Sequence, residues 1–132
     1  MKGTKYPYTG KKGSCRADGS GIKIQGKTKV DKQSKAGHLT AIARGPTSVS
    51  VASSEDIFVH YKQGVINNAA ACTTNTDHNV TAIGYTSNYY IIKNSWNTTW
   101  GENGFAKIAF NGEGLGVCGI QKAGFTPYIL QK

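Results

Sequence analysis

Residues 77–96 read DHNVTAIGYTSNYYIIKNSW, and they carry the clearest structural signal in the chain. Its two β-rich runs, 80–85 and 89–93, are separated by a short polar turn, so we expect them to form a hairpin. His78 stands at the entry of the first strand and Asn94, sixteen residues later, at the exit of the second. Because neighbouring antiparallel strands lie ~5 Å apart, residues at the same end of a hairpin can touch. The sequence therefore predicts an imidazole beside a carboxamide at one end of a sheet.

This predicted pair suits a site that transfers protons. A carboxamide oxygen can accept the ring N–H of a histidine and so fix the tautomer and orientation of the ring. The other ring nitrogen is then free to face a thiol and take its proton. Trp96, two residues beyond Asn94, can cover the hydrogen bond and keep water from competing for it.

Short strands and one clear helix are predicted over the rest of the chain. Seventeen glycines and seven tyrosines in 132 residues favour a loop-rich, mostly β fold, with a single domain over residues 1–132. Ser34 can cap a helix over 34–44 that Gly45-Pro46 ends, and a shorter helix with an acidic first turn is expected over 53–61. Further strands are expected at 21–30, 47–52 and 105–110, and the glycine-rich tail closes with residues 125–130. The predicted fold class is α+β, with predominantly antiparallel β structure.

Several motifs follow one another in a recognisable order. They are Tyr6-Pro7-Tyr8 followed by a cysteine, Gly45-Pro46 before a Ser-Val strand, 77–85, 93–105 and Gly116-Val117-Cys118-Gly119. In this order the chain resembles the papain family of cysteine proteases, and 77–85 and 93–105 resemble the family's histidine and asparagine blocks. The resemblance implies the C-terminal half of the papain-like fold, a β-barrel-like right domain with one or two short helices.

The resemblance also implies roles at the site. His78 would be the general base and acid of a thiolate–imidazolium pair, and Asn94 would orient its ring. Trp96 and Asp77 would support the pair. Peptide hydrolysis by a cysteine endopeptidase of this kind passes through an acyl-enzyme and uses no cofactor.

The family's cysteine nucleophile is not expected in this chain. It lies in a Cys-Gly-Ser-Cys-Trp-like segment well over a hundred residues before the histidine, whereas 77 residues precede His78. Cys15 follows a Gly-Ser pair as the nucleophile would, but no aromatic residue follows it, and its place matches a family cysteine that pairs with the N-terminal half. Cys72 and Cys118 resemble the family's disulfide within the C-terminal half, which leaves Cys15 as an unpaired thiol. We therefore expect the chain to be inactive alone and to need the N-terminal half as its partner.

Four residues resemble the family's main specificity pocket: Ser50, Thr76, Asn79 and, at its base, Ala123. A small uncharged residue at the bottom of the pocket leaves room for a bulky apolar side chain of the substrate and offers no carboxylate to an arginine. An apolar preference two residues before the cleaved bond is therefore expected, as in cathepsin L-like enzymes. Peptides and proteins are the expected substrates, and the expected location is lysosomal, vacuolar or secreted.

Composition leaves two other functions open. Residues 1–44 hold eleven of the sixteen Lys and Arg residues and two of the seven acidic ones, and such a surface can bind polyanions. A solvated surface is the simpler interpretation, so nucleic acid is not expected as a partner. The chain could also be a catalytically silent module that binds peptides or proteins, and its uncovered domain interface favours self-association. Residues 1–10 contain no apolar core of a signal peptide, and there is no run of ~20 apolar residues to span a membrane.

Two glycosylation sequons are present, Asn79-Val80-Thr81 and Asn97-Thr98-Thr99. A glycan on Asn79 would block the cleft beside His78, so this sequon is discounted. Asn97 stands where the family usually has a glycine after Asn-Ser-Trp, which indicates either a changed turn or a true acceptor. His38, in the polar part of the first predicted helix, and His60, in the second, have no cysteine or carboxylate at metal-ligand spacing. Both are interpreted as surface or packing residues, and no metal site is expected.

Overall fold

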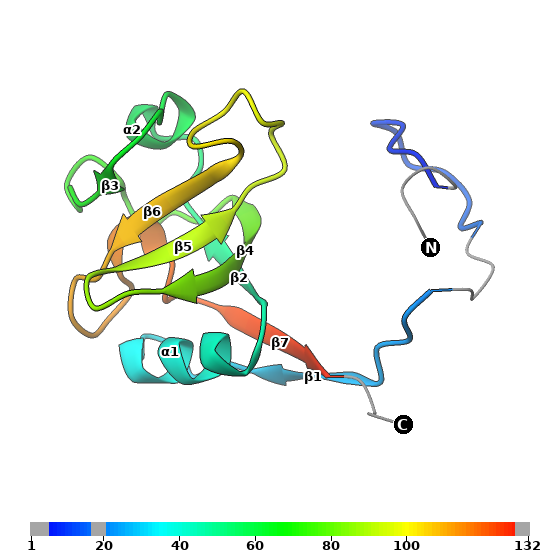
Figure 1. The fold of residues 1–132 in the computed structure, drawn as a ribbon, viewed down its shortest axis with the longest axis horizontal. Helices are drawn as coiled ribbons and strands as arrows, with labels where there is room; N and C mark the ends of the chain where they lie inside the picture. The colour runs from blue at the N-terminus through cyan, green and yellow to red at the C-terminus, as the bar shows by residue number, and fades with distance from the viewer. Residues whose placement is uncertain (1–5, 17–20, 129–132) are drawn as a thin grey trace.

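A computed structural model of the chain describes residues 6–16 and 21–128. Within these residues, seven strands form one sheet in the order β1-β7-β2-β4-β5-β6-β3 (Figure 1). Every neighbouring pair is antiparallel except β3 and β6, which are parallel. The strands are β1 Gly26–Lys29, β2 Thr47–Val51, β3 Val65–Ile66, β4 His78–Tyr85, β5 Tyr89–Lys93, β6 Phe105–Ala109 and β7 Gly124–Tyr128. The helices are α1 Lys35–Arg44, α2 Asp56–Val59 and a 3₁₀ turn, η1, at Val117–Gly119.

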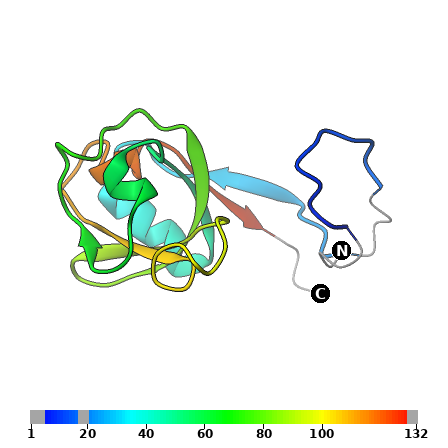
Figure 2. The same cartoon turned by 90° about the horizontal axis from the view of Figure 1, so that it is seen from above.

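The sheet confirms the predicted class but remains open. Its two edges in the described part of the chain are β1 and β3, so strand pairing does not close the expected barrel. Seen from above, the sheet curves around the core, and the ribbon of β1 and β7 extends away from it toward residues 6–16 (Figure 2). Residues 6–16 are exposed throughout and lie apart from the sheet in both views.

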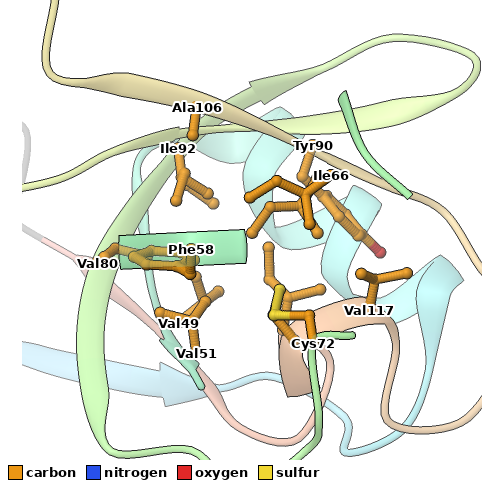
Figure 3. Close-up of a cluster of buried hydrophobic side chains, with 14 of the residues drawn as sticks. Val49, Val51, Phe58, Ile66, Cys72, Val80, Tyr90, Ile92, Ala106 and Val117 are labelled. Carbon is orange, nitrogen blue, oxygen red and sulfur yellow. A yellow bond between two sulfur atoms is a disulfide. The ribbon is translucent and has the colours of Figure 1, made fainter. Parts of the chain in front are cut away.

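Side-chain alternation along the central strands buries one face of the sheet. Val49 and Val51 of β2, like Tyr90 and Ile92 of β5, are at most 1% exposed, while the residues between them are half-buried. This period of two is the pattern of a sheet with one face on a core. Side chains from these strands, from Phe58 of α2 and from η1 converge on a common centre (Figure 3).

The long helix begins and ends where its sequence predicts. The Ser34 hydroxyl accepts the N–H of Gly37 at 3.0 Å, and the N–H of Gly45 donates to the carbonyl of Ile42. His38 is on its inner side and fully buried, not in a polar part of the helix. Its Nδ1 donates to the carbonyl of Ser34 at 2.9 Å, and burial lowers the pKa of its imidazole. His38 is therefore a packing residue.

Two predicted elements are shorter than expected. The second helix covers Asp56–Val59 instead of 53–61, and no side chain caps it. The first strand covers Gly26–Lys29 instead of 21–30 because only this part pairs with β7. The structure adds a strand, β7 at Gly124–Tyr128, that the sequence analysis did not assign. No helix in the described ranges is long and apolar enough to cross a membrane.

The β4–β5 hairpin forms as predicted and sets the geometry of the site. Thr81 of β4 lies opposite Lys93 of β5, and Tyr85 lies opposite Tyr90. The register shifts between Ala82 and Gly84, which marks a β-bulge. Figure 1 shows β4 beginning and β5 ending at the same end of the sheet. His78 is the first residue of β4 and Asn94 directly follows β5, so both lie at that end.

A buried disulfide fastens the loop before β4 to η1. Cys72 and Cys118 are bonded, as the resemblance implied, and both are fully buried. The N–H of Cys118 also donates to the carbonyl of Cys72 at 3.3 Å. Since Cys72 is six residues before His78, this link limits the movement of the segment that leads into the site.

Replacing Cys72 and Cys118 together by serine should destabilise the chain by about 4 kcal/mol in the chain-entropy model, because the bond closes a loop with a separation of 46 residues. Urea unfolding followed by circular dichroism measures this change. Cys15→Ser is the matched control, since Cys15 is free and exposed. Equal unfolding midpoints for the double variant and the control would contradict the prediction.

Candidate active site

His78 and Asn94 meet at the open end of the β4–β5 hairpin. Nε2 of His78 lies 2.9 Å from Oδ1 of Asn94. The N–H of Ser95 donates to the same Oδ1 at 2.7 Å. A backbone N–H can only donate, so this atom is the carboxamide oxygen and the imidazole must donate to it from Nε2. In the neutral ring Nδ1 therefore carries a lone pair and can accept a proton.

Asn94 is itself held firmly. It is 9% exposed, and its N–H donates to the carbonyl of Gly104 at 2.9 Å. The chain turns back between them through Gly101, whose φ is +56°. A Cβ at Gly101 would lie 2.5 Å from the carbonyl oxygen of Phe105, so only glycine fits this turn. The backbone thus presents the Asn94 oxygen to the histidine in a fixed direction.

An aromatic cluster connects the histidine to the core. The ring of Trp96 stacks on His78 with a centroid distance of 5.2 Å and an interplanar angle of 24°. Trp96 in turn packs edge-on against Phe58 and Trp100, both at 5.6 Å. Trp100 donates its indole N–H to the carbonyl of Phe58 at 3.1 Å. Trp96 therefore lies where it can cover the imidazole, and the buried Phe58 supports it from behind.

Asp77 fixes the residue before the histidine. Its carboxylate accepts the N–H of Ser53 at 2.7 Å and the N–H of Ser54 at 3.2 Å, as well as the Ser54 hydroxyl. The Ser54 hydroxyl and the two N–H groups hold the pKa of this carboxyl well below its usual range. Ser53 and Ser54 lie in the loop before α2 and not in its first turn, where the sequence predicted them. Sequence reasoning missed both serines as supporting residues of the site.

Three of the four expected pocket residues lie together. Ser50 and Asn79 are cross-strand partners on β2 and β4, and the Ser50 hydroxyl donates to Oδ1 of Asn79 at 2.9 Å. The N–H of Ser50 lies 3.3 Å from the carbonyl of Ala123. Thr76, on the loop before β4, instead lines a shallow hollow with Asp77 and Ser54. Ser50 and Asn79 thus form a hydrogen-bonded polar pair beside His78.

The remaining candidate residues lie elsewhere. Cys15 is exposed in the segment 6–16, which lies apart from the sheet. His60 is exposed beside α2. Across residues 6–16 and 21–128, His, Cys, Asp and Glu side chains form no group of three that could hold a metal ion.

Comparison with known proteins places this geometry in a family. The family model described as papain family cysteine protease matches residues 1–128. The chain belongs to the papain family. Among its relatives, papaya proteinase 4 of Carica papaya is 40% identical over 131 residues, which are 93% of this chain and 37% of that protein. Mexicain of Jacaratia mexicana is 40% identical over 126 residues, which are 92% of this chain and 58% of that protein.

Solved papain-family structures share the fold. The Carica candamarcensis cysteine protease CMS1MS2 in complex with E-64 matches with a TM-score of 0.88 and 34% identity, over 98% of this chain and 62% of that one. The bromelain protease of Ananas comosus in complex with E64 matches with a TM-score of 0.84 and 34% identity, over 97% of this chain and 62% of that one. The chain thus spans less than two thirds of these papain-family proteins and corresponds to the C-terminal part of their fold.

Asp77→Asn should lower the urea midpoint of unfolding at pH 7, because an amide cannot reproduce the charge-assisted bonds to Ser53 and Ser54. The pKa of the Asp77 carboxyl is lowered in the folded state. The stabilisation by these bonds is therefore present above the ordinary carboxyl pKa of ~4 and is lost as the pH falls below it. The difference between wild type and variant should therefore shrink on acidification.

Asp31→Asn, on an exposed carboxyl outside the site, is the matched control. Unfolding curves recorded from pH 7 to pH 3 for all three proteins test the prediction. A wild-type advantage over Asp77→Asn that stays constant across this range would contradict it.

Proposed function

We propose that this chain contributes His78 and Asn94 to a papain-like cysteine endopeptidase whose nucleophilic cysteine lies in the N-terminal half, outside this chain. The observation that carries the proposal is the 2.9 Å bond from Nε2 of His78 to Oδ1 of Asn94. It leaves Nδ1 as the proton acceptor, which is the form that a thiol needs beside it.

In this proposal the site first forms an acyl-enzyme and then hydrolyses it. Nδ1 takes the proton of the cysteine, and the thiolate attacks the peptide carbonyl to form a tetrahedral intermediate. The intermediate collapses to an acyl-enzyme as Nδ1 returns the proton to the leaving amine. A water then gives a proton to Nδ1 as its oxygen attacks the acyl carbon, and the C–S bond breaks to release the carboxylic acid and leave the cysteine as a thiolate beside the imidazolium. Asn94 and Trp96 act as positioning residues that hold the imidazole in one orientation throughout.

The N-terminal half is the proposed partner of this chain. Tyr8, Ile22 and Ile24 are 97%, 82% and 64% exposed, which is unusual for large apolar side chains of a stable monomer. A second polypeptide that covers them would remove this apolar surface from water. Without it, the same side chains favour self-association.

The proposed location is lysosomal, vacuolar or secreted. A buried disulfide such as Cys72–Cys118 forms and persists in an oxidising compartment. The family's plant members support the same proposal.

The chain alone should not hydrolyse a fluorogenic peptide, and mixing it with the N-terminal half of a papain-family relative should produce activity. His78→Ala should reduce that activity by a factor on the order of 10² to 10⁴, because it removes the general acid and base. Asn94→Ala should cause a smaller loss, since it removes only the orienting bond.

His60→Ala is the matched control, because this histidine is exposed beside α2 and makes no part of the site. Assembly of the two halves is followed in the same samples by size-exclusion chromatography. Assembly without activity would favour a silent peptide-binding module over an endopeptidase. Activity that survives His78→Ala would overturn the proposed role.

Substrate preference follows from the base of the proposed pocket. We propose an uncharged, mainly apolar side chain two residues before the cleaved bond, because Ala123 adds no charge and little volume there. Its half-buried position beside Ser50 supports this placement.

Ala123→Glu in the assembled enzyme should raise cleavage of substrates with arginine two residues before the cleaved bond, relative to leucine, by at least about tenfold, since a carboxylate then faces the guanidinium. Ala123→Gln controls for the added volume without the charge. The ratio of kcat/KM for paired arginine and leucine substrates is the measurement. An unchanged ratio for Ala123→Glu would place the pocket elsewhere.

A further inference from the structure

The turn after Trp96 carries a sequon that the proposed chemistry does not use. Asn97, Thr98 and Thr99 are all exposed and belong to no helix or strand. They form the Asn-x-Thr pattern that accepts N-linked oligosaccharides. The turn lies between the buried Asn94 and the buried Trp100, so its tip points away from the core.

The backbone and side chain of Asn97 leave its amide nitrogen available. Its φ is +72°, in the left-handed region that asparagine tolerates better than most residues with a side chain. Oδ1 accepts the N–H of Thr98 at 2.6 Å and the Thr98 hydroxyl at 3.2 Å. The hydrogen bonds of this side chain within the described residues therefore use its oxygen. Glycosyl transfer modifies the nitrogen, so a sugar there leaves the turn's own bonds intact.

The other sequon differs in its place in the fold, although Asn79 is also exposed and its described hydrogen bond also uses the oxygen. Asn79 lies within β4, paired to Ser50 on β2, and its Oδ1 accepts the Ser50 hydroxyl at 2.9 Å. Thr81 is half-buried and pairs with Ser48 of β2 on one side and with Lys93 of β5 on the other. An oligosaccharide on Asn79 would have to leave the sheet surface beside a neighbouring strand. The structure therefore separates two sequons that are equivalent as sequence patterns.

The disulfide supplies an independent observation about where the chain matures. Cys72 and Cys118 are bonded and fully buried, so the fold requires an oxidising compartment. N-linked glycans are a feature of proteins that mature along the secretory route. A chain that acquires this disulfide in a secretory cell therefore also meets the oligosaccharide donor.

We propose that Asn97 is an N-glycosylation site of this chain and that Asn79 is not. In the reaction the Asn97 amide nitrogen forms a bond to C1 of the first sugar of a lipid-diphosphate-linked oligosaccharide. The bond from C1 to the diphosphate oxygen breaks, the lipid diphosphate leaves with the electron pair, and a base of the transferase takes the N–H proton. The glycan then stands one residue from Trp96, whose ring stacks on His78. The proposal depends on the fold and not on the proposed peptidase activity.

The test is secretion of the full chain from a eukaryotic host, followed by mass spectrometry before and after treatment with peptide N-glycosidase. The wild type should lose mass on treatment, and the peptide containing position 97 should show the conversion of asparagine to aspartate that the enzyme leaves behind. Asn97→Gln and Thr99→Val should remove the glycan completely.

Thr99→Ser keeps the sequon and should keep the glycan. This variant therefore controls for a glycan that is lost only because a substitution at position 99 disturbs the turn. Asn79→Gln and Thr81→Val are the matched changes in the other sequon and should leave the glycan in place. A secreted wild-type chain of unmodified mass would overturn the proposal. So would a glycan that persists in Thr99→Val or disappears in Thr81→Val.

Discussion

The contact between His78 and Asn94 depends on the register of β4 against β5. Tyr90 and Ile92 of β5 face the core and are fully buried, and they fix which side of the hairpin points inward. A slip of one residue would turn these side chains to solvent and send the Asn94 carboxamide to the opposite face. The energy that aligns the two polar side chains therefore comes from apolar burial several residues away. The hydrogen bond itself needs to contribute little to the stability of the fold.

The imidazole is then held by groups from distant parts of the chain. Asp77, beside it in sequence, is tied to the N–H groups of Ser53 and Ser54, and Trp96 lies between the ring and Phe58 of α2. The segment from β2 to α2 thus supports the site from two sides, and Val51 of β2 is the cross-strand partner of His78. Contacts from so many parts of the chain hold the imidazole and the carboxamide in place, which is the arrangement that the proposed proton transfer needs.

Features that depend on local sequence could be predicted, and features that depend on distant partners could not. The β4–β5 hairpin and the α1 helix follow from alternation, a three-residue turn and the Ser34 cap, and the structure confirms them. Ser53 and Ser54 were predicted in the first turn of α2 but lie in the loop before it, where Asp77, more than twenty residues away, accepts their N–H groups, a contact that the local sequence does not reveal. The sequence left His38 open between a surface and a packing residue, because the strand that lies against it, β7, is far along the chain. The open sheet was missed because the resemblance carried the expectation of a barrel.

The two edges of the open sheet have a consequence for how the protein behaves at high concentration. An unpaired strand invites another chain to add to it, and this is how ordered fibrils grow. Here one edge, β3, is only two residues long, and the other, β1, carries Lys27 and Lys29. Stacking copies along β1 would bring like charges together within a few ångströms. The lysines that make this chain basic therefore also slow polymerisation along this edge.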